Sequence, residues 1–561
     1  MRRPGPWRRR DVVAALLATL LSGLVLAGLA GFTVERIWHN DGLDYAQIAR
    51  EVADGHGMSS RQAIYALHLR FLADHGLLDE PWPNLHRFPL PTLTLALLFL
   101  VFGAGTTAVL AQGVLAVALT SGVLHLWARQ ALGAWPAAAV SLLLTANAGL
   151  FWGVQAGMPE PLAALFTTVA LYLFWLARRR ESRGRPDRRW WLAAGVFLGL
   201  AVLSRTNVIT LLPVLLLASF PWRLPVEREE RSAARRRWLA GAAGLILGLV
   251  VMLSPWWVRN ARLTGSPSFS LHSYYLVPSG TLPGESKKDY SAPWVRDFVP
   301  PLDYALDHPR ELARKWLHQG GRIAARYPFL AGTLLLPLLP WLGWGRRLGG
   351  ELRGTAVIFC LGFVANALLC NFTDLNLEHY YFHLLPVMLL VAVAVVTGAV
   401  RRVPVREGRR WLPATAAVLG LLWMAHPEAL AAVLERTADK SANRVDLEPM
   451  AEIAARTTED AVVFSDRSAQ VTWYTGRRTV RFHYVRDAEG RKKAAVLELS
   501  HDFLPMDAVY LSGTFLSDPK RRRMFTRLER DPEFQRLYRC GPPLADGGVF
   551  CWRRRQPKAG G

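Results

Sequence analysis

The sequence contains few cysteines and lacks the phosphate-binding motifs of soluble nucleotide enzymes. Only four of its 561 residues are cysteine, too few for a disulfide framework. Cys360 and Cys370 fall within or at the end of an apolar run, whereas Cys540 and Cys551 could close a hairpin disulfide if the tail lies outside the cell. No Walker loop and no Rossmann glycine pattern is present, so no soluble nucleotide is expected as a cofactor.

Acidic residues are scarce relative to basic ones. The chain has 44 Asp and Glu against 67 Lys and Arg, a formal net charge of +23. A basic surface is typical of nucleic-acid-binding proteins, but here the arginines cluster in short segments between apolar runs. Because basic short loops mark the cytoplasmic side of a membrane protein, we expect no nucleic-acid partner. The clusters lie at residues 2–10, 178–189, 223–237, 346–353 and 401–410.

Long apolar runs, in contrast, are abundant. Hydrophobic residues make up 51% of the chain and the mean hydropathy is +0.16, although 20% of the residues are charged. A helix needs roughly 20 apolar residues to cross about 30 Å of hydrocarbon. Several segments meet this requirement, so the sequence predicts an all-α polytopic membrane protein. They include residues 11–31, 105–128, 238–258, 355–370 and 384–400.

The first span is expected to stay attached, because no convincing small-residue cleavage site follows it. It would deliver a large external loop, residues 34–88. Residues 89–104 are apolar but short and contain two prolines, so we expect them to insert only partly. Residues 191–220 lie between two arginine-rich loops and should enter and return, with the polar turn 204–207 near the outer face. Further spans are expected near 135–155 and 160–178.

A second external loop, residues 259–328, contains an amphipathic stretch at 302–326 that is typical of a surface-lying helix. The last spans bring a polar tail to the external side, where its pattern predicts a small α/β domain. We therefore divide the chain into a multi-span domain, residues 1–427, and an external C-terminal domain, residues 428–561. The last spans are expected at 329–345, 355–371, 380–400 and 411–427. The tail should contain strands at 461–464 and 507–511 and helices at 448–456 and 519–530.

The first external loop should cover the membrane surface. Residues 43–54 place apolar side chains at i, i+3, i+4 and i+7, and residues 60–78 are also amphipathic. Both patterns predict interfacial helices. Asp41 lies at the start of this loop, where a carboxylate near the lipid boundary is costly unless it has a partner or a function.

Several polar and aromatic residues are predicted to converge on the external face. Arginine binds phosphate bidentately and stays charged at any accessible pH. A carboxylate can take a proton from an incoming hydroxyl or amine, and aromatic rings can stack on a sugar. Such a set suits an anionic lipid carrier, with Asp41 as general base and Arg87 and Arg259 as stabilisers of a leaving phosphate. The candidate residues are Asp41, Asp44, Tyr45, Arg87, Glu160, Arg259, His379 and Tyr380.

The carboxylates also have plain structural interpretations. Asp41 or Asp44 could cap the helix at 43–54; we favour catalysis for Asp41 and a capping or hydrogen-bonding role for Asp44. Glu160 could act in the site or be only a first-turn acid at a helix N-terminus. Asp41 and Glu160 offer oxygen ligands to a divalent cation, but nothing in their spacing demands one, so no cofactor is assigned.

The remaining candidates could equally serve the membrane interface. Arg87 and Arg259 could extend toward the lipid head groups. His379 fits a packed interfacial histidine better than a catalytic one. Tryptophans and tyrosines at span ends are typical of the aromatic belt.

An ordered set of motifs resembles a known superfamily. It comprises Asp41 with residues 45–51, followed by residues 87–90, 160–162, 199–205 and 255–260. Over about residues 11–400 the chain looks like the GT-C superfamily. In particular it is similar to bacterial glycosyltransferase family 39 proteins, which are related to protein O-mannosyltransferases and lipid A aminoarabinose transferases. The order of the set, more than any single motif, carries the resemblance.

The resemblance implies transfer of a sugar from a polyprenyl-phosphate donor to a lipid, glycan or protein acceptor on the external side of the membrane. It implies that Asp41 is the catalytic acidic residue, that Glu160 orders the site or a metal, and that Arg87 lies near the donor phosphate. Arg259 falls in the basic motif after a Pro-Trp pair. His379 and the tyrosine after it stand where many members have Arg-Tyr.

Two other functions are compatible with the sequence. A transporter or lipid flippase would place ionisable groups mid-span and show paired broken helices, whereas here the polar clusters lie mostly at outer span ends. A non-catalytic envelope assembly protein would keep the scaffold and use the tail to bind a partner. We expect a multi-pass protein of the bacterial cytoplasmic membrane, with its site and tail outside.

Overall fold

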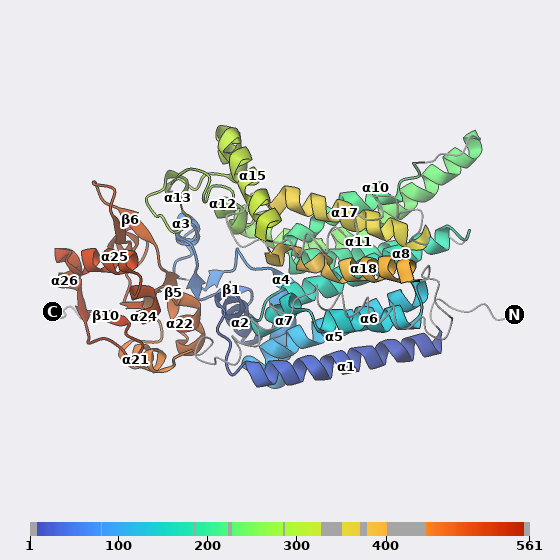
Figure 1. The fold of residues 1–561 in the computed structure, drawn as a ribbon. Coiled ribbons are helices and arrows are strands. Elements are labelled where there is room, and N and C mark those ends of the chain that lie inside the picture. Colours follow the sequence, from blue (N-terminus) through green and yellow to red (C-terminus); the bar gives the residue numbers. More distant parts are fainter. Residues whose placement is uncertain are drawn as a thin grey trace.

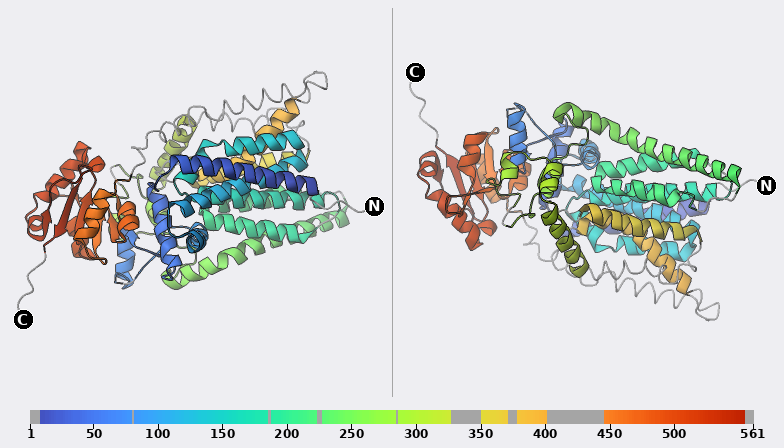
Figure 2. Two further views of the ribbon diagram at one scale, coloured as in Figure 1. Left: turned by 90° about the horizontal axis from the view of Figure 1, so that it is seen from below. Right: turned by 90° about the horizontal axis from the view of Figure 1, so that it is seen from above.

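The structure, a computed structural model, describes residues 8–79, 81–184, 187–222, 227–283, 286–326, 350–370, 378–400 and 445–554. A bundle of long helices forms one half of the molecule and an α/β unit lies at its end (Figures 1 and 2). This architecture confirms the predicted all-α membrane domain with a small C-terminal α/β domain. The predicted boundary at 427/428 and the predicted spans at 329–345 and 411–427 lie outside the described residues.

Among the described residues, five helical runs are long and apolar enough to cross a membrane. They correspond to spans predicted from the sequence. The runs are α1 (Arg9–Thr33), α5 (Thr106–Ala131), α8 (Glu160–Glu181), α11 (Arg228–Thr264) and His379–Gly398, which covers most of η3 (Glu378–Leu384) and α18 (Leu385–Val400). On α1 the side chains of Leu16, Leu20 and Leu24 are more than half exposed, as expected for a surface that faces lipid.

Other apolar helices complete the bundle: α4 (Pro89–Phe102), α6 (Ala134–Thr145), α7 (Ala148–Gln155), α9 (Arg188–Ser204), η1 (Thr206–Thr210), α10 (Leu211–Ser219) and α17 (Gly350–Cys370). The span predicted at 355–371 is a helix, α17, but its apolar part, Gly354–Cys370, is not one of the five long runs. With 14 residues, α4 is about 21 Å long, too short to cross about 30 Å of hydrocarbon. The span predicted near 135–155 is bent by 46° between α6 and α7, where Asn147 caps α7.

The chain reverses direction within residues 191–220, as expected of a segment that enters and returns. The backbone breaks at Arg205, which contacts Glu160 at the start of α8. The end of α10 returns toward the start of α11, because the Trp238 indole donates to the Ser219 hydroxyl at 3.2 Å.

The external loops contain short elements between the bundle and the α/β unit. In the first loop, α2 (Asn40–Ala53) confirms the helix predicted at 43–54. The single helix predicted at 60–78 is wrong in its first part, because backbone pairing makes strands of residues 59–63. The stretch 302–326 is two helices, since Pro309 begins a new one. These elements are β1 (Ser59–Ser60), β2 (Gln62–Ala63), α3 (Ala66–Asp74), β3 (Trp82–Pro83), α12 (Leu271–Leu276), α13 (Pro293–Arg296), α14 (Pro301–Asp307) and α15 (Pro309–Arg326).

The α/β unit contains the predicted elements and several more. Its helices are α21 (Glu448–Arg456), α22 (Ser468–Thr475), α23 (Val496–Asp502), α24 (Gly513–Leu516), α25 (Pro519–Glu529) and α26 (Pro532–Leu537). Its strands are β4 (Val462–Ser465), β5 (Arg478–Arg481), β6 (Tyr484–Arg486), β7 (Lys492–Ala494), β8 (Ala508–Leu511), β9 (Tyr538–Cys540) and β10 (Val549–Arg553). α21, α25, β4 and β8 confirm the four elements expected in the tail.

One six-stranded sheet joins the tail to the first loop. Its order is β2-β5-β4-β8-β10-β9, with β2, β5, β4 and β8 mutually parallel and β10 antiparallel to β8 and β9. Because β2 comes from the first external loop, the C-terminal sheet is incomplete without residues from the other predicted domain. The sequence analysis did not predict that a strand from the first loop joins this sheet.

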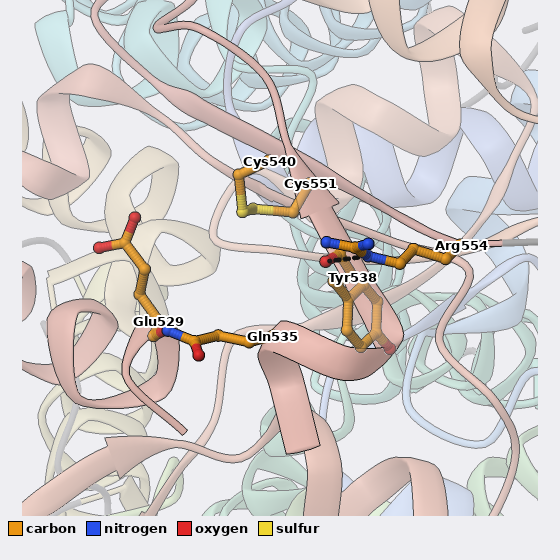
Figure 3. Close-up of a disulfide and its surroundings, with 6 residues drawn as sticks. All are labelled: Glu529, Gln535, Tyr538, Cys540, Cys551 and Arg554. Carbon is orange, nitrogen blue, oxygen red and sulfur yellow. Dashed lines mark hydrogen bonds between the residues drawn. A yellow bond between two sulfur atoms is a disulfide. The ribbon is translucent and has the colours of Figure 1, made fainter. Parts of the chain in front are cut away.

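A disulfide joins Cys540 to Cys551 across the paired strands β9 and β10 (Figure 3). It confirms the bridge suggested by the sequence. Beside it, Arg554 donates to the Tyr538 carbonyl at 3.2 Å. Cys360 and Cys370 take no part in this bridge.

Candidate functional site

Two carboxylates lie on α2, at the end of the bundle that faces the α/β unit (Figure 1). The residue before this helix, His39, is its N-cap, and its ring accepts a hydrogen bond from the Asp41 amide at 3.3 Å. Neither Asp41 nor Asp44 is therefore the N-cap, and the capping interpretation was wrong for both. Gly42 lies so close to Ala156 that a Cβ there would overlap the Ala156 carbonyl oxygen, which makes glycine necessary beside Asp41.

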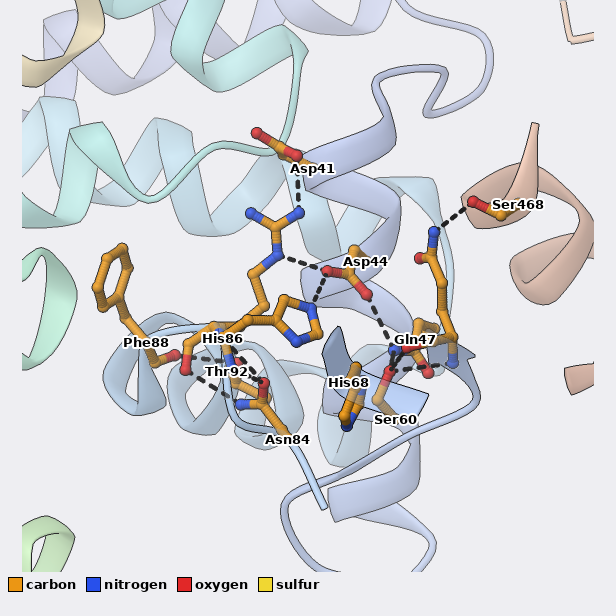
Figure 4. A network of polar contacts seen from close by, with 12 residues as sticks. Asp41, Asp44, Gln47, Ser60, His68, Asn84, His86, Phe88, Thr92 and Ser468 are labelled. Carbon is orange, nitrogen blue, oxygen red and sulfur yellow. Dashed lines mark hydrogen bonds and ion pairs between the residues drawn. The ribbon is translucent and has the colours of Figure 1, made fainter. Parts of the chain in front are cut away.

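Arg87 contacts both carboxylates, Asp41 and Asp44, whose side chains are labelled in Figure 4. Its Nη2 donates to Asp41 Oδ1 at 2.7 Å, and its Nε donates to Asp44 Oδ2. Asp44 also contacts His86 Nε2 at 2.9 Å and accepts from Gln47 Nε2 at 3.1 Å. Asp41 and Arg87, which the sequence assigned to one site, are thus in direct contact.

A buried asparagine holds the turn that presents Arg87. The side-chain oxygen of Asn84 accepts from the amides of His86 and Arg87 at 3.2 and 2.9 Å. Its amide nitrogen donates back to the Arg87 carbonyl at 3.0 Å. The sequence analysis missed Asn84, although asparagine is typical of such turns.

Burial and charge act in opposite directions on the two carboxyl groups. Burial would raise the pKa of Asp41, but the charge and hydrogen bond of Arg87, together with the charges of His39 and Arg481, outweigh it and hold that pKa well below its ordinary value. For Asp44, burial is likewise outweighed by Arg87 and His86, and the pKa is lowered to about 2. Both groups are ionised at neutral pH. They differ in access, because 38% of the Asp41 side chain is exposed and none of the Asp44 side chain is.

A second ion pair joins Glu160, the first residue of α8, to Arg205. The Glu160 side chain is fully buried, and its Oε2 has no hydrogen-bond partner in the part of the chain that the structure describes. The Arg205 guanidinium lies 4.5 Å from the centroid of the Tyr380 ring. Asn207 donates to the Tyr380 carbonyl at 2.9 Å. Arg205 was not among the predicted site residues, although an arginine within an apolar segment is a functional signal.

Tyr45 lies between the two ion pairs. The Arg87 Cζ is 5.1 Å from its ring centroid. Burial raises the pKa of Tyr45, and the charges of Arg87, Arg205 and Glu160 all act on its hydroxyl. One polar zone at the end of the bundle therefore contains Asp41, Asp44, Tyr45, Arg87, Glu160, Arg205 and Tyr380.

The other two predicted residues lie at the edges of this zone. The His379 and Tyr380 ring centroids are 4.6 Å apart. Arg259 instead donates to the carbonyls of Met58 and Asn84 at 3.2 and 3.0 Å. It therefore braces the turn that presents Arg87 and makes no contact with the carboxylates. A direct contact of Arg259 with a donor phosphate stays a prediction.

The arrangement does not favour a metal ion. Within the described ranges no three His, Cys, Asp or Glu side chains are grouped so that they could hold one. The two oxygen ligands suggested by the sequence, Asp41 and Glu160, each contact a guanidinium instead.

Part of this chain is similar to a known protein family. A family model described as Dolichyl-phosphate-mannose-protein mannosyltransferase matches residues 79–258. That segment contains Arg87, Glu160 and Arg205 but not Asp41. No curated protein matches the chain.

Solved structures match nearly the whole chain. One is ArnT from Cupriavidus metallidurans bound to undecaprenyl phosphate, at 14% identity and a TM-score of 0.55, covering 96% of this chain and 98% of that one. Another is the archaeal oligosaccharyltransferase AglB from Archaeoglobus fulgidus, in complex with an inhibitory peptide and a dolichol-phosphate. It has 13% identity and a TM-score of 0.55, and the match covers 97% of this chain and 75% of that one. At such identities the likeness shows the fold.

Proposed function

Because the chain has the fold of the GT-C glycosyltransferases, we propose that it is a membrane enzyme that moves a sugar from a polyprenyl-phosphate donor to an acceptor on the external face. The observation that carries the proposal is the ion pair between Asp41 and Arg87. It places a partly exposed, ionised carboxylate against a buried cation. Sugar transfer from a lipid phosphate uses both groups. The carboxylate takes the acceptor's proton, and the cation stabilises the leaving phosphate.

The bonds that change can be written for these two residues. The acceptor oxygen or nitrogen attacks the anomeric carbon, and the bond from that carbon to the phosphate oxygen breaks with its electron pair on the phosphate. The acceptor's proton moves to Asp41. Because Asp41 then loses its charge, Arg87 Nη2 becomes available to the leaving phosphate, while Asp44 continues to bind Arg87 Nε.

The low pKa of Asp41 determines when the proton moves. A carboxylate with a depressed pKa is a weak base toward a free hydroxyl. The acceptor oxygen becomes acidic only as it bonds to carbon, so proton transfer should accompany bond formation rather than precede it. Asp41 would orient the hydroxyl first and take its proton late.

The neighbouring residues complete the proposed site. Arg205 would supply a second cation near the donor phosphate, and Glu160, being buried, would act as a positioning residue that holds Arg205. The rings of Tyr45, His379 and Tyr380 would contact the sugar. Arg259 would support donor binding through the turn that it braces.

The distribution of charge supports an external site. α8 begins with Glu160 in the polar zone and ends with Arg178, Arg179 and Arg180. α1 begins with Arg9 and Arg10 and ends at Thr33, just before α2. Because arginine clusters mark the cytoplasmic side, we infer that the site and the α/β unit face outward from a bacterial cytoplasmic membrane.

A transporter or flippase fits these positions less well. Such proteins place ionisable groups near the middle of their spans. Here Asp41 and Arg87 lie outside the membrane-spanning runs, and Glu160 is the first residue of one. A non-catalytic assembly protein would have no use for an exposed carboxylate paired with a buried arginine.

The experiment that tests the proposal supplies candidate donors to purified protein in nanodiscs with a membrane extract as acceptor. Radiolabelled polyprenyl-phosphate sugars should give labelled acceptor and an equal amount of free polyprenyl phosphate, whereas nucleotide sugars should give neither. Absence of turnover with every polyprenyl-phosphate sugar would contradict the proposal. Movement of intact donor across a proteoliposome membrane would then favour a flippase.

A further inference from the structure

The carboxyl ends of three parallel strands meet at one edge of the C-terminal sheet. Arg481 ends β5 opposite Ser465, which ends β4. The next residue, Asp466, accepts hydrogen bonds from the amide and hydroxyl of Ser512, directly after β8, at 2.8 and 2.7 Å. β5 and β8 lie on opposite sides of β4, and in open sheets ligands bind outside the carboxyl ends at such a point.

The second external loop brings lysines to this edge. The Tyr484 amide donates to the Lys288 carbonyl at 2.9 Å, and the Tyr290 amide donates to the Tyr484 carbonyl at 2.8 Å. The loop therefore runs beside β6, three residues after Arg481. Lys287 places its ammonium 5.8 Å from the centroid of the Tyr275 ring.

The cations at this edge are close enough to repel one another. Burial, and then the charges of Arg481, Lys287 and Arg521, lower the pKa of Lys288 to about 8, against the single opposing charge of Asp466. Lys287, Lys288 and Arg481 are all partly exposed. Among the described residues, neither Lys288 nor Arg481 forms an ion pair. An anion would relieve this repulsion.

The same edge faces the polar zone of the bundle. The charge of Arg481 contributes to lowering the pKa of both His39 and Asp41. α22, which follows β4, packs on the segment that leads into α2, with the Tyr474 hydroxyl donating to the Ile37 carbonyl at 2.9 Å. A group bound beside Arg481 would therefore lie near Asp41.

We propose that Lys287, Lys288 and Arg481 bind a phosphate group of the acceptor and so present the acceptor's nucleophile to Asp41. This role presupposes the proposed function and deepens it by naming the class of acceptor, a molecule that carries a phosphate near the group to be glycosylated. In the proposed function the donor phosphate is bound by Arg87 and Arg205. Lys287, Lys288 and Arg481 are therefore available to bind the second substrate, the acceptor.

Acetylation of lysines, read by mass spectrometry, tests this binding without any sugar transfer. The full-length protein in phosphatidylcholine nanodiscs is labelled at pH 8, where Lys288 is partly uncharged and therefore reactive. Inorganic pyrophosphate should protect Lys287 and Lys288. In Arg481→Gln, protection should need about tenfold more pyrophosphate, the loss expected for one charge-assisted hydrogen bond. Arg530→Gln, which removes an exposed charge at the far end of α25, should protect like the wild type.

A second arm identifies the source of the phosphate. In this arm, nanodiscs that contain phosphatidic acid are used in place of pyrophosphate. Protection of the two lysines by both ligands would show that the site recognises the phosphate group itself. Protection by the lipid alone would show that it recognises a phosphate carried by a lipid. No protection in either arm, or equal protection in Arg481→Gln and wild type, overturns the proposal. Should Arg481→Gln fail to fold, Lys288→Gln replaces it with Lys287 as the labelled amine. Failure of sugar transfer would leave these binding results unaffected, so the two proposals can fail separately.

Discussion

Two carboxylate–arginine pairs lie at the end of the bundle, and they differ in what surrounds the carboxylate. Asp41 pairs with Arg87 and keeps 38% of its side chain exposed, whereas Glu160 pairs with Arg205 and is fully buried. The exposed part of Asp41 is open to a substrate, whereas the Glu160 side chain is buried beside Arg205. The exposed carboxylate is therefore the candidate for chemistry, and the buried one positions an arginine.

Arg87 also contacts more carboxylates than Arg205 does. It contacts two carboxylates, and the buried one, Asp44, is itself bound by His86 and Gln47. Arg87 would therefore stay in place when Asp41 is protonated. Arg205 depends on Glu160 as its single carboxylate among the described residues.

Removal of Arg87 should cause the largest loss of both stability and transfer. Arg87→Gln leaves Asp44 buried without its main counter-charge, which typically costs about 3–5 kcal/mol of stability. Sugar transfer should also fall by at least ~100-fold, because the leaving phosphate loses a cation. Thermal unfolding in detergent and the transfer assay measure the two losses. Arg87→Lys, which keeps the charge but not the paired geometry, should lie between; a variant as stable and active as wild type would contradict the assignment.

Glu160→Gln should affect mainly stability. It leaves Arg205 buried without a counter-charge, and we expect a loss of about 3 kcal/mol, seen as a lower unfolding midpoint. Glu160→Gln combined with Arg205→Gln should regain part of that loss. Transfer per folded molecule should change far less in Glu160→Gln than in Asp41→Asn. Loss of transfer at unchanged stability would instead assign catalysis to Glu160.

Gly42→Ala should move Asp41 without changing its side chain. The added Cβ overlaps the Ala156 carbonyl, and such overpacking costs about 1–3 kcal/mol. Transfer should fall as well, because α2 must shift and carry Asp41 with it. Gly28→Ala on α1, where a Cβ meets nothing within 4 Å, is the matched control for both measurements.

The smallest expected effect concerns pH. The folded pKa of Asp44 is about 2, below an unfolded value of about 3.9. Asp44 therefore contributes stability above pH about 4, and that contribution is lost as pH falls toward 2. Unfolding midpoints of wild type and Asp44→Asn should differ by a constant amount from pH 5 to 7 and converge below pH 4. A difference that changes near neutral pH would contradict this ionisation.

Much of the fold could be predicted from the sequence, because span length and arginine placement report directly on membrane crossing. The tail's β4, β8, α21 and α25 also followed from local patterns. The strand β2 could not be found, since two residues carry no periodic signal and pair only with a strand more than 400 positions away. The bend at Asn147 was likewise hidden inside an apolar run.

The site was predictable in its charged residues and less so in their pairing. Asp41, Arg87 and Glu160 stand out because ionisable side chains beside membrane spans are costly. Which arginine each acid contacts depends on how α2, α8 and α9 pack, and that information is not local. Arg205 and Asn84 were missed although each carries a local signal, an arginine within an apolar segment and an asparagine typical of turns. The position of Arg259 behind the turn of Asn84 is another consequence of packing.

The role of Asp41 as general base is tested by the rate of sugar transfer of Asp41→Asn beside wild type, with the thermal unfolding midpoint determined on the same preparation. Loss of a general base should slow transfer by about 10²–10⁴-fold, while the midpoint stays close to that of wild type because Arg87 keeps Asp44. Transfer at the wild-type rate by folded Asp41→Asn would contradict the account.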